Sequence, residues 1–407
     1  METVKLGDIT FKIGSGATPR GGKSVYISDG VALVRSQNIL DLAITRDGLV
    51  FIDDEAASKL AGATVEEGDV LINITGDSTA RVALWDMDIP ARVNQHVAIL
   101  RPDHTRLNPR WLQYWLVQPR IKSHLLVLAS SGASRPALTK GMLTNLKIPL
   151  PDLIHQGKVA AVLGALDDKI AANNEVVQRA NTLSTAFMGI DFEESSSTPL
   201  KDVTSLIARG VTPRYDDAGG YTVLNQRCIR DSRVNVALSR TMKSLPKSPE
   251  KILRKNDVLV NSTGQGTLGR IARWISPDPN VAVDTHVSIV RFDPDLADPA
   301  FAGTILSTME RLVEDLAEGS TGQTELKRDL LGRLELNLPP LEKQRQVGQK
   351  ITFLDELCHA HTEENTFLAS TRDELLPLLM SGKITVREAK QEVAAAGVSV
   401  PGEESEA

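Results

Sequence analysis

The most regular pattern of hydrophobic positions in this chain is a stripe with a strict heptad spacing, and it occurs twice. Its steps alternate between four and three residues, which is typical of a coiled-coil seam. The first stripe contains Val159, Leu163, Leu166, Ile170, Asn173 and Val177, and the second, 188 residues later, contains Val347, Ile351, Leu354, Cys358, His361, Asn365 and Leu368. The pattern predicts two long helices that pair as an antiparallel coiled coil, in which the polar members fix the register. Two independent surface helices are the alternative.

Short β-branched runs precede each long helix. Val70–Ile74 and Val258–Asn261 both end at a Thr-Gly pair, and His96–Arg101 returns as His286–Arg291. Alternating short runs of this kind indicate strands. The dipeptides Asn108-Pro109 and Asp298-Pro299 then indicate the start of a shorter helix in each copy, because proline suits the first helical position. Each copy is therefore predicted to be an α+β domain.

Framing motifs repeat together with these elements. Gly16–Arg20 returns as Gly210–Arg214, so the whole chain is an internal repeat of roughly 190 residues, far longer than the units of a solenoid. We predict two tandem α+β domains with pseudo-two-fold symmetry, a shape that suits a two-fold or bipartite target. The expected boundaries are 1–151 for the first domain, 152–190 for the first helix, 191–199 for a linker, 200–340 for the second domain, 341–387 for the second helix and 388–407 for an acidic, disordered tail.

The net charge of −6 is unevenly spread. Residues 1–151 carry 17 Lys and Arg against 15 Asp and Glu, and residues 200–340 carry 19 against 18, whereas residues 341–407 carry 7 against 12. Nearly neutral domains would bind DNA weakly through charge alone, so a DNA-binding role would require a basic partner. The absence of a signal peptide and of a long apolar run predicts a cytosolic protein that does not enter a membrane. Cys228 and Cys358 suggest neither a disulfide nor a metal site.

One motif suggests a nucleotide site. Gly264–Gly269 formally matches the glycine-rich dinucleotide fingerprint, but the residues after it, Arg270–Ile275, alternate like a strand where the fingerprint needs a helix. A nucleotide-binding enzyme therefore stays an alternative. No P-loop, methyltransferase motif or nuclease carboxylate cluster is visible, so no catalytic residue is predicted. His96 and His286 begin equivalent strands and are interpreted as structural histidines.

The better candidates for function lie in loops that differ between the copies. They are rich in Arg, Asn, Gln, Ser and Thr, the side chains that contact base edges and phosphates, although solvated turns are the simpler interpretation of any single one. The candidate DNA-binding residues are Arg20, Arg35, Gln37, Asn38, Ser78, Thr79, Arg81, Ser134 and Arg135 in the first copy, and Arg214, Asn225, Gln226, Arg227, Thr267, Arg270, Thr321 and Gln323 in the second.

The phrases that close each domain resemble a known family. Each domain ends in a Leu-Pro phrase, Ile148–Pro151 or Leu336–Pro340, followed by Gln156 or Gln344 and the long helix. Together with the ending Leu375–Ile384, these features resemble the specificity subunit of type I restriction–modification enzymes over residues 1–387. The first copy departs from the motif with Asp152–His155, where the second has Pro340–Lys343.

The resemblance implies a non-catalytic subunit that recognises double-stranded DNA. Each target-recognition domain would read one half of a bipartite site, and the helices would set the gap between the halves. Two methylation subunits, which carry S-adenosylmethionine, would dock on the helices, and restriction subunits that use ATP and Mg²⁺ would join them, so this chain itself would bind no cofactor. A scaffold that pairs through its helices without DNA is the remaining alternative.

Overall fold

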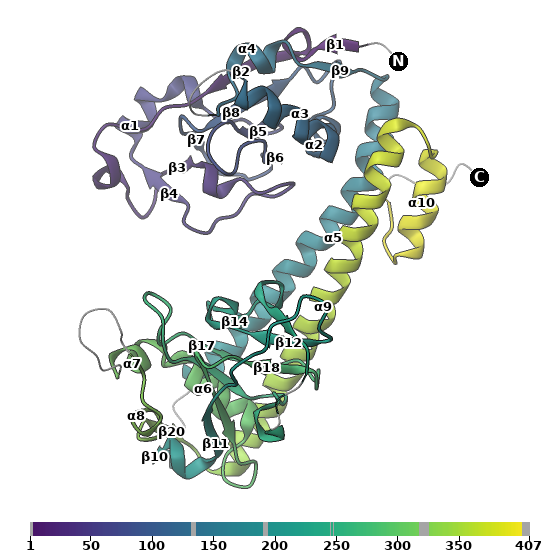
Figure 1. Cartoon of the computed structure of the whole chain (residues 1–407). Coiled ribbons are helices and arrows are strands. Elements are labelled where there is room, and N and C mark those ends of the chain that lie inside the picture. The colour runs from purple at the N-terminus through teal and green to yellow at the C-terminus, as the bar shows by residue number, and fades with distance from the viewer. Residues whose placement is uncertain are drawn as a thin grey trace. The chain divides into compact units, whose positions relative to one another are not determined.

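The computed structural model describes residues 3–131, 136–189, 194–244, 246, 248–316 and 325–400. The chain divides into two compact units, Met1–Ala172 with Asn365–Ala407, and Asn173–Glu364. Each unit consists of one α+β domain and parts of the two long helices (Figure 1).

The first domain contains a four-stranded antiparallel sheet and a three-stranded sheet. Their orders are β2-β8-β5-β6 and β4-β3-β7, and β3 and β7 run parallel. The strands are β1 (Thr3–Lys5), β2 (Thr10–Ser15), β3 (Val31–Val34), β4 (Val50–Ile52), β5 (Val70–Asn73), β6 (Val82–Leu84), β7 (Ala91–Val93), β8 (Val97–Pro102) and β9 (Lys147–Pro149). The helices are α1 (Asp54–Lys59), α2 (Pro109–Val117), α3 (Pro119–Ser130) and α4 (Lys140–Thr144).

The second domain repeats this topology strand for strand. Its sheets have the orders β11-β19-β16-β17 and β15-β12-β18, and a two-stranded pair, β10-β20, matches β1-β9. A hairpin, β13-β14, is added to this set. The strands are β10 (Ser196–Pro199), β11 (Thr204–Arg209), β12 (Tyr221–Leu224), β13 (Ile229–Arg230), β14 (Arg233–Val234), β15 (Arg240–Met242), β16 (Val258–Asn261), β17 (Ile271–Arg273), β18 (Val281–Val283), β19 (Val287–Phe292) and β20 (Glu335–Leu338), and the helices are α6 (Pro299–Thr308), α7 (Glu310–Asp315) and α8 (Arg328–Gly332).

The start of the repeated Gly-x-Thr-Pro-Arg phrase needs glycine for space. A Cβ on Gly16 would lie 1.7 Å from the carbonyl oxygen of Val93, and a Cβ on Gly210 would lie 2.2 Å from that of Val283. In both domains this glycine lets the chain that leaves the four-stranded sheet pass against the backbone of the three-stranded sheet. Packing between the two sheets therefore explains the repeated glycine.

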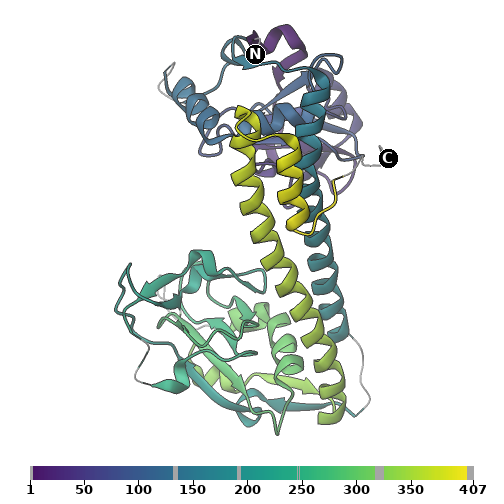
Figure 2. The same cartoon turned by 90° about the vertical axis from the view of Figure 1, so that its right-hand side faces the viewer.

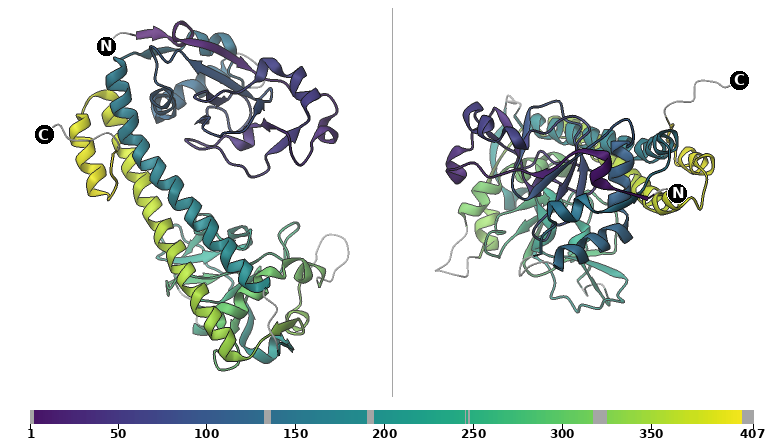
Figure 3. Two further views of the ribbon diagram at one scale, coloured as in Figure 1. Left: turned by 180° about the vertical axis from the view of Figure 1, so that it is seen from behind. Right: turned by 90° about the horizontal axis from the view of Figure 1, so that it is seen from above.

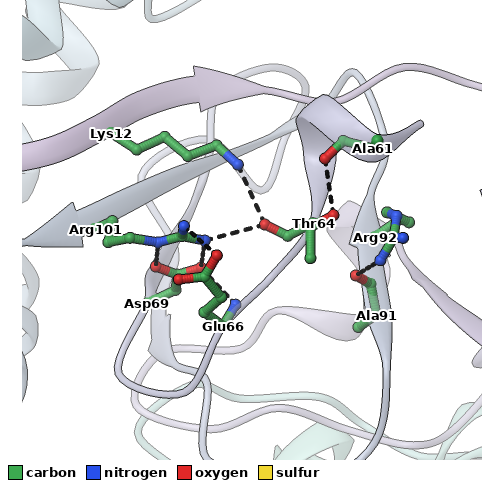
Figure 4. A network of polar contacts seen from close by, with 8 residues as sticks. All are labelled: Lys12, Ala61, Thr64, Glu66, Asp69, Ala91, Arg92 and Arg101. Atoms are coloured by element: carbon green, nitrogen blue, oxygen red, sulfur yellow. Dashed lines mark hydrogen bonds and ion pairs between the residues drawn. The ribbon is translucent and has the colours of Figure 1, made fainter. Parts of the chain in front are cut away.

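A buried carboxylate–guanidinium pair recurs in both four-stranded sheets. Arg101 donates to both carboxylate oxygens of Asp69, at 2.8 and 2.9 Å, and also to the Thr64 carbonyl (Figure 4). In the second domain Arg291 donates to both oxygens of Asp257, at 2.7 and 2.6 Å. Bidentate geometry and the added carbonyl contacts satisfy charges that would otherwise be costly to bury.

The predicted starts of the shorter helices are confirmed. The Asn108 side chain accepts a hydrogen bond from the Trp111 N–H at 3.0 Å and caps α2. The Asp298 side chain accepts one from the Phe301 N–H at 2.9 Å and caps α6. Both caps satisfy an N–H group that the first helical turn leaves without an intrahelical partner.

The long helices α5 (Leu153–Ala186) and α9 (Leu341–Ser381) pair in antiparallel fashion, as predicted (Figure 1). In the first unit Arg372 donates to Asp167 at 2.6 Å. In the second unit Asn173 donates to Glu364 at 2.8 Å, and Cys358 Sγ lies 3.8 Å from the Val177 carbonyl oxygen. Successive contacts therefore join later residues of α5 to earlier residues of α9, as in an antiparallel pair.

The predicted seam does more than join the two helices. Val159, Leu163, Leu166 and Leu368 are buried in the hydrophobic core of the first unit. Val347 and Ile351 are buried in the core of the second α+β domain, together with residues such as Phe301. Other predicted residues of the seam are partly exposed, namely Ile170, Val177, Leu354, His361 and Asn365. The heptad stripe therefore pairs the helices and also anchors them in the domains.

Several predicted boundaries differ from the structure, and the second long helix, expected over 341–387, ends at Ser381. Within the predicted linker 191–199, Ser196–Pro199 forms β10 and pairs with β20, so the second domain begins earlier than expected. The first long helix ends at Ala186 and continues only as a 3-10 turn over Phe187–Gly189. The linker was mispredicted because its strand is polar and pairs with residues about 140 positions away.

The prediction of a disordered tail from residue 388 is wrong for its first part. Thr385 and Glu388 form a reciprocal capping box that starts α10 (Val386–Ala395), and Ala389 and Val393 are fully buried. The helix packs beside the adjoining parts of α5 and α9 (Figures 2 and 3). Its apolar residues are spaced by four, a helical signal that the high acidic content obscured. Residues 401–407 lie outside the described part of the chain.

None of the helices in the described part of the chain combines the length and apolar character that a membrane span needs.

A glutamine joins each domain to its long helix. The side chain of Gln344, which is 3% exposed, accepts a hydrogen bond from the Asp298 N–H at 3.0 Å and donates to the Pro339 carbonyl at 2.7 Å. Gln156 does the same with the Asn108 N–H at 2.8 Å and the Pro151 carbonyl at 2.7 Å. The start of each long helix is therefore fixed against the N-terminal end of α2 or α6.

Replacing Gln344 with alanine should lower the free energy of unfolding by about 1–3 kcal/mol, because the Asp298 N–H and the Pro339 carbonyl both lose their partner. The matched control is Gln346→Ala two residues on, which removes an exposed side chain of the same type. Calorimetric melting of the full chain measures both. Equal melting temperatures for the two variants would contradict the junction role.

Candidate nucleic-acid interface

In each domain a buried asparagine at the end of a central strand holds two of the candidate loops together. Asn73 donates to the Ser36 carbonyl at 2.8 Å and to Ser78 Oγ at 3.0 Å. It therefore links the 3-10 turn over Ser36–Asn38 to the loop between β5 and β6. The candidates in these two loops are thus neighbours in the structure.

The second domain contains the same hydrogen-bonded link. Asn261 donates to the Gln226 carbonyl at 2.9 Å and to the Thr267 carbonyl at 3.0 Å. It links the 3-10 turn over Gln226–Cys228 to the loop between β16 and β17. Both asparagines are fully buried, so their function is to fix the loops.

A histidine–threonine pair extends each loop cluster. Thr75 Oγ1 lies 2.6 Å from His96 Nδ1, and Thr263 Oγ1 lies 2.7 Å from His286 Nδ1. The backbone N–H of His286 donates to the carboxyl group of Asp284. Burial raises the pKa of Asp284 above its usual value, although this hydrogen bond acts in the opposite direction. Both histidines were predicted to begin strands but lie in the turns directly before β8 and β19. Their threonine partners were not predicted, although Thr75 and Thr263 occupy equivalent positions in the repeat.

Residues that follow the third candidate loop of each domain contact the threonine of the histidine–threonine pair. Isolated bridges join Thr75 to Ala137 and Thr263 to Glu325, so the segments that follow the shorter helices run beside each histidine–threonine pair. Four candidates from these segments, Ser134, Arg135, Thr321 and Gln323, lie outside the described residues.

Burial separates residues that shape the loops from residues that face outward. Asn38 is fully buried, where its Oδ1 accepts from the Arg35 N–H at 3.1 Å and its Nδ2 donates to two loop carbonyls. Its counterpart in the second domain is the buried Cys228. Thr79 is 5% exposed and donates to the Gly76 carbonyl at 2.6 Å. The structure does not support a direct DNA contact for Asn38 or Thr79.

Several arginine and polar candidates brace the loops while remaining partly exposed. Arg35 donates to the Gly48 carbonyl and lies 5.6 Å from the Tyr26 ring centre, and Arg270 donates to the Gly266 carbonyl at 2.9 Å. The partly exposed candidates are Arg35, Ser78, Arg81, Asn225, Gln226, Thr267 and Arg270.

The most outward candidates occupy equivalent places. Gln37 and Arg227 are the exposed middle residues of the two 3-10 turns, and Arg20 and Arg214 end the repeated Thr-Pro-Arg phrase and are also exposed. The two domains therefore present different side chains, Gln and Arg, from the same backbone position. Both types can contact a base with two hydrogen bonds.

The glycine-rich stretch Gly264–Gly269 connects two strands. It lies between β16 and β17, and Gly264, Gly266 and Gly269 have φ values of 106°, 71° and 84°. A dinucleotide fingerprint needs a helix after its glycines, whose N-terminus holds the pyrophosphate. Here the glycines serve a tight β-loop that faces Gln226.

The helix pair of the second unit also has an exposed apolar side. Phe353 is 65% exposed on α9, and Leu183 and Val176 are 48% and 36% exposed on α5. Asp355 accepts from Arg273 of the α+β domain at 2.6 and 2.8 Å. Phe353 lies two residues before Asp355, which corresponds to about 200° around the helix. Its side chain therefore points away from that domain.

Val176 and Leu183 lie on that same side of the pair. Val176 directly precedes the seam position Val177, Leu183 lies one heptad further along α5, and Phe353 follows the seam position Ile351 by two. In an antiparallel coiled coil these heptad positions of the two helices flank the same edge of the seam. We name Val176, Leu183 and Phe353 the apolar helix face.

Comparisons with known proteins agree with this architecture. A family model described as the type I restriction modification DNA specificity domain matches residues 1–181 and 193–366. The putative type I restriction enzyme MjaX specificity subunit of Methanocaldococcus jannaschii is 21% identical over 404 residues, covering 95% of this chain and 94% of that protein. The type I restriction enzyme EcoBI specificity subunit of Escherichia coli is 27% identical over 170 residues, covering 41% and 35%.

A solved structure shares the fold. The S subunit of a type I restriction-modification system from M. genitalium superposes with a TM-score of 0.60 at 14% identity, covering 93% of this chain and 95% of that chain. Because the family model covers most of both copies, the chain belongs to the type I restriction modification DNA specificity domain family.

Proposed function

We propose that this chain is the DNA-recognition subunit of a type I restriction–modification complex and that each α+β domain reads one half of a bipartite site. The observation that carries the proposal is the pair of equivalent loop clusters, which share their buried supports and differ in their outward side chains. Membership of the specificity family supports it.

The chemistry of the outward residues supports separate reading by the two domains. Arg227 offers the paired donors that suit the O6 and N7 atoms of guanine, whereas Gln37 offers the donor and acceptor that suit adenine. Arg20 and Arg214 are supplied by a phrase common to both copies, which suits contacts with phosphates that carry no sequence information. Two readers on one repeated scaffold would recognise two different half-sites.

We further propose that catalysis belongs to partner subunits. Two methylation subunits would supply S-adenosylmethionine, restriction subunits would supply ATP and Mg²⁺, and this chain would bind none of these cofactors. The apolar helix face fits a docking role, because it points away from the domain that would hold DNA. The paired helices would then both receive the methylation subunits and set the spacing between half-sites.

Replacing Arg227 with alanine should relax base preference in one half-site only, because a lost bidentate contact removes about 1–3 kcal/mol of discrimination. The readout is selection of bound random duplexes by the complex assembled with methylation subunits. Arg254→Ala, which removes an exposed arginine elsewhere on the same domain, is the matched control and should leave both preferences intact. If the Arg227 variant loses preference in both half-sites, the domains do not read independently.

The double variant Leu183→Ser and Phe353→Ser should weaken binding of a methylation subunit by tenfold or more. Fully burying one large apolar side chain is worth about 1.5–3 kcal/mol. Titration followed by mass photometry gives the affinity and the number of methylation subunits bound. Leu296→Ser, which removes a 53% exposed leucine from the second domain, is the control. Unchanged loading of the double variant would exclude this face as the docking site.

A further inference from the structure

The second domain carries a strongly basic segment that its repeat counterpart lacks. We name residues 225–243 the basic flap; it joins β12 to β15 and contains Arg227, Arg230, Arg233, Arg240 and Lys243 against one acid, Asp231. The equivalent segment of the first domain, residues 35–53, which likewise runs through β4 to the residue after it, carries two basic and three acidic residues. The shared fold therefore does not require this charge.

The basic flap is an ordered substructure. The hairpin β13-β14 turns at Asp231 and Ser232, whose φ values of 51° and 56° are those of a tight hairpin turn. A 3-10 turn, Val236–Leu238, follows, and two hydrogen bonds close the flap: Asn235 N–H to the Cys228 carbonyl at 2.7 Å, and Asn225 Nδ2 to the Leu238 carbonyl at 3.2 Å. The backbone that carries its arginines is thus ordered.

The positive charges of the flap face solvent and are poorly neutralised. Within the described part of the chain, the one ion pair of Arg230 is with its neighbour Asp231 at 3.4 Å, where the two side chains are 74% and 85% exposed. Among the described residues, Arg227, Arg233 and Lys243 are exposed and form no ion pair. Since like charges repel, a cluster of this kind costs stability unless an anion binds it.

The charge continues beyond the flap onto the Thr-Pro-Arg phrase. The Lys243 N–H donates to the Arg214 carbonyl at 3.4 Å, and the guanidinium of Arg240 lies 3.5 Å from the centre of the Tyr215 ring. The exposed Arg214 is thereby joined to the end of the flap, and Arg227 to its beginning. The flap therefore begins at Arg227 and ends beside Arg214, two of the outward residues of the second domain.

We propose that the basic flap binds the phosphate backbone of DNA beside the half-site read by the second domain. The inference rests on the proposed function. Regularly spaced phosphates match several exposed cations on one surface, and such contacts strengthen binding to every sequence equally. The rest of residues 200–340 is net negative, so the flap concentrates positive charge where the domain as a whole has almost none.

The test is the salt dependence of binding by the full chain to a random-sequence duplex of about 24 base pairs, measured by fluorescence anisotropy. Each phosphate contact contributes about 0.9 to the slope of log affinity against log salt. Arg230→Gln with Arg233→Gln should therefore reduce the slope by about 1–2. Arg230→Lys with Arg233→Lys should retain it, because the charges remain.

The matched control, Arg254→Gln with Arg333→Gln, removes the same charge from exposed sites outside the flap and should leave the slope nearly unchanged. Equal slopes for the flap and control variants would overturn the inference. Tighter binding of the wild-type chain to an RNA duplex, lost on the same two flap substitutions, would also overturn it by assigning the flap to RNA.

A second measurement separates this inference from the proposed function. In selections by the assembled complex, the Gln flap variant should keep the base preferences of both half-sites, because phosphate contacts do not read sequence. A changed preference would make the flap a base reader and overturn the inference. If the wild-type complex shows no base preference at all, the proposed function fails, whatever the slopes of the flap variants.

Discussion

The architecture of the recognition surface depends on one hydrogen-bonded side chain in each domain, the amide of Asn73 or Asn261. It lies at the end of a central strand, is fully buried, and binds the turn after one strand to the loop after another. Buried polar groups are costly unless paired, so the two hydrogen bonds made by each amide nitrogen favour the arrangement in which both loops lie against the strand. The positions of Gln37 and Arg227, which lie in the two linked turns, depend on this contact.

Fixing the loops from inside leaves their outer positions free to differ. Asn38 and Cys228 fill equivalent interior places with unlike side chains, and each receives the N–H of the residue that precedes the turn. One position earlier, Gln37 and Arg227 are exposed, and the Gln37 amide donates to the Gly48 carbonyl at 3.4 Å. A change of recognition residue can therefore occur without a change of fold, which suits a subunit whose copies must recognise different sequences.

Local signals in the sequence predicted the elements that local physics determines. Heptad spacing identified the helix pair, and Asn-Pro and Asp-Pro identified the helix starts, because seams and caps need particular residues at short range. Long-range pairing escaped prediction: Ser196–Pro199 is a strand only because β20 lies beside it. The burial of Asn38 was not predicted for the same reason. The sequence alone does not show whether a polar residue between two strands is hydrogen-bonded to water or to loop carbonyls.

The two domains are alike in fold but differ in how their charged residues are distributed. The two domains share strands, caps and buried ion pairs, yet the segment between β12 and β15 is basic and that between β3 and β4 is neutral. Specific reading needs a rigid support in both domains, because each base contact depends on geometry. Attraction to phosphates depends only on proximity, so it can be concentrated in one domain and serve the whole complex. The internal repeat thus constrains geometry at both sites and leaves electrostatics free to be unequal.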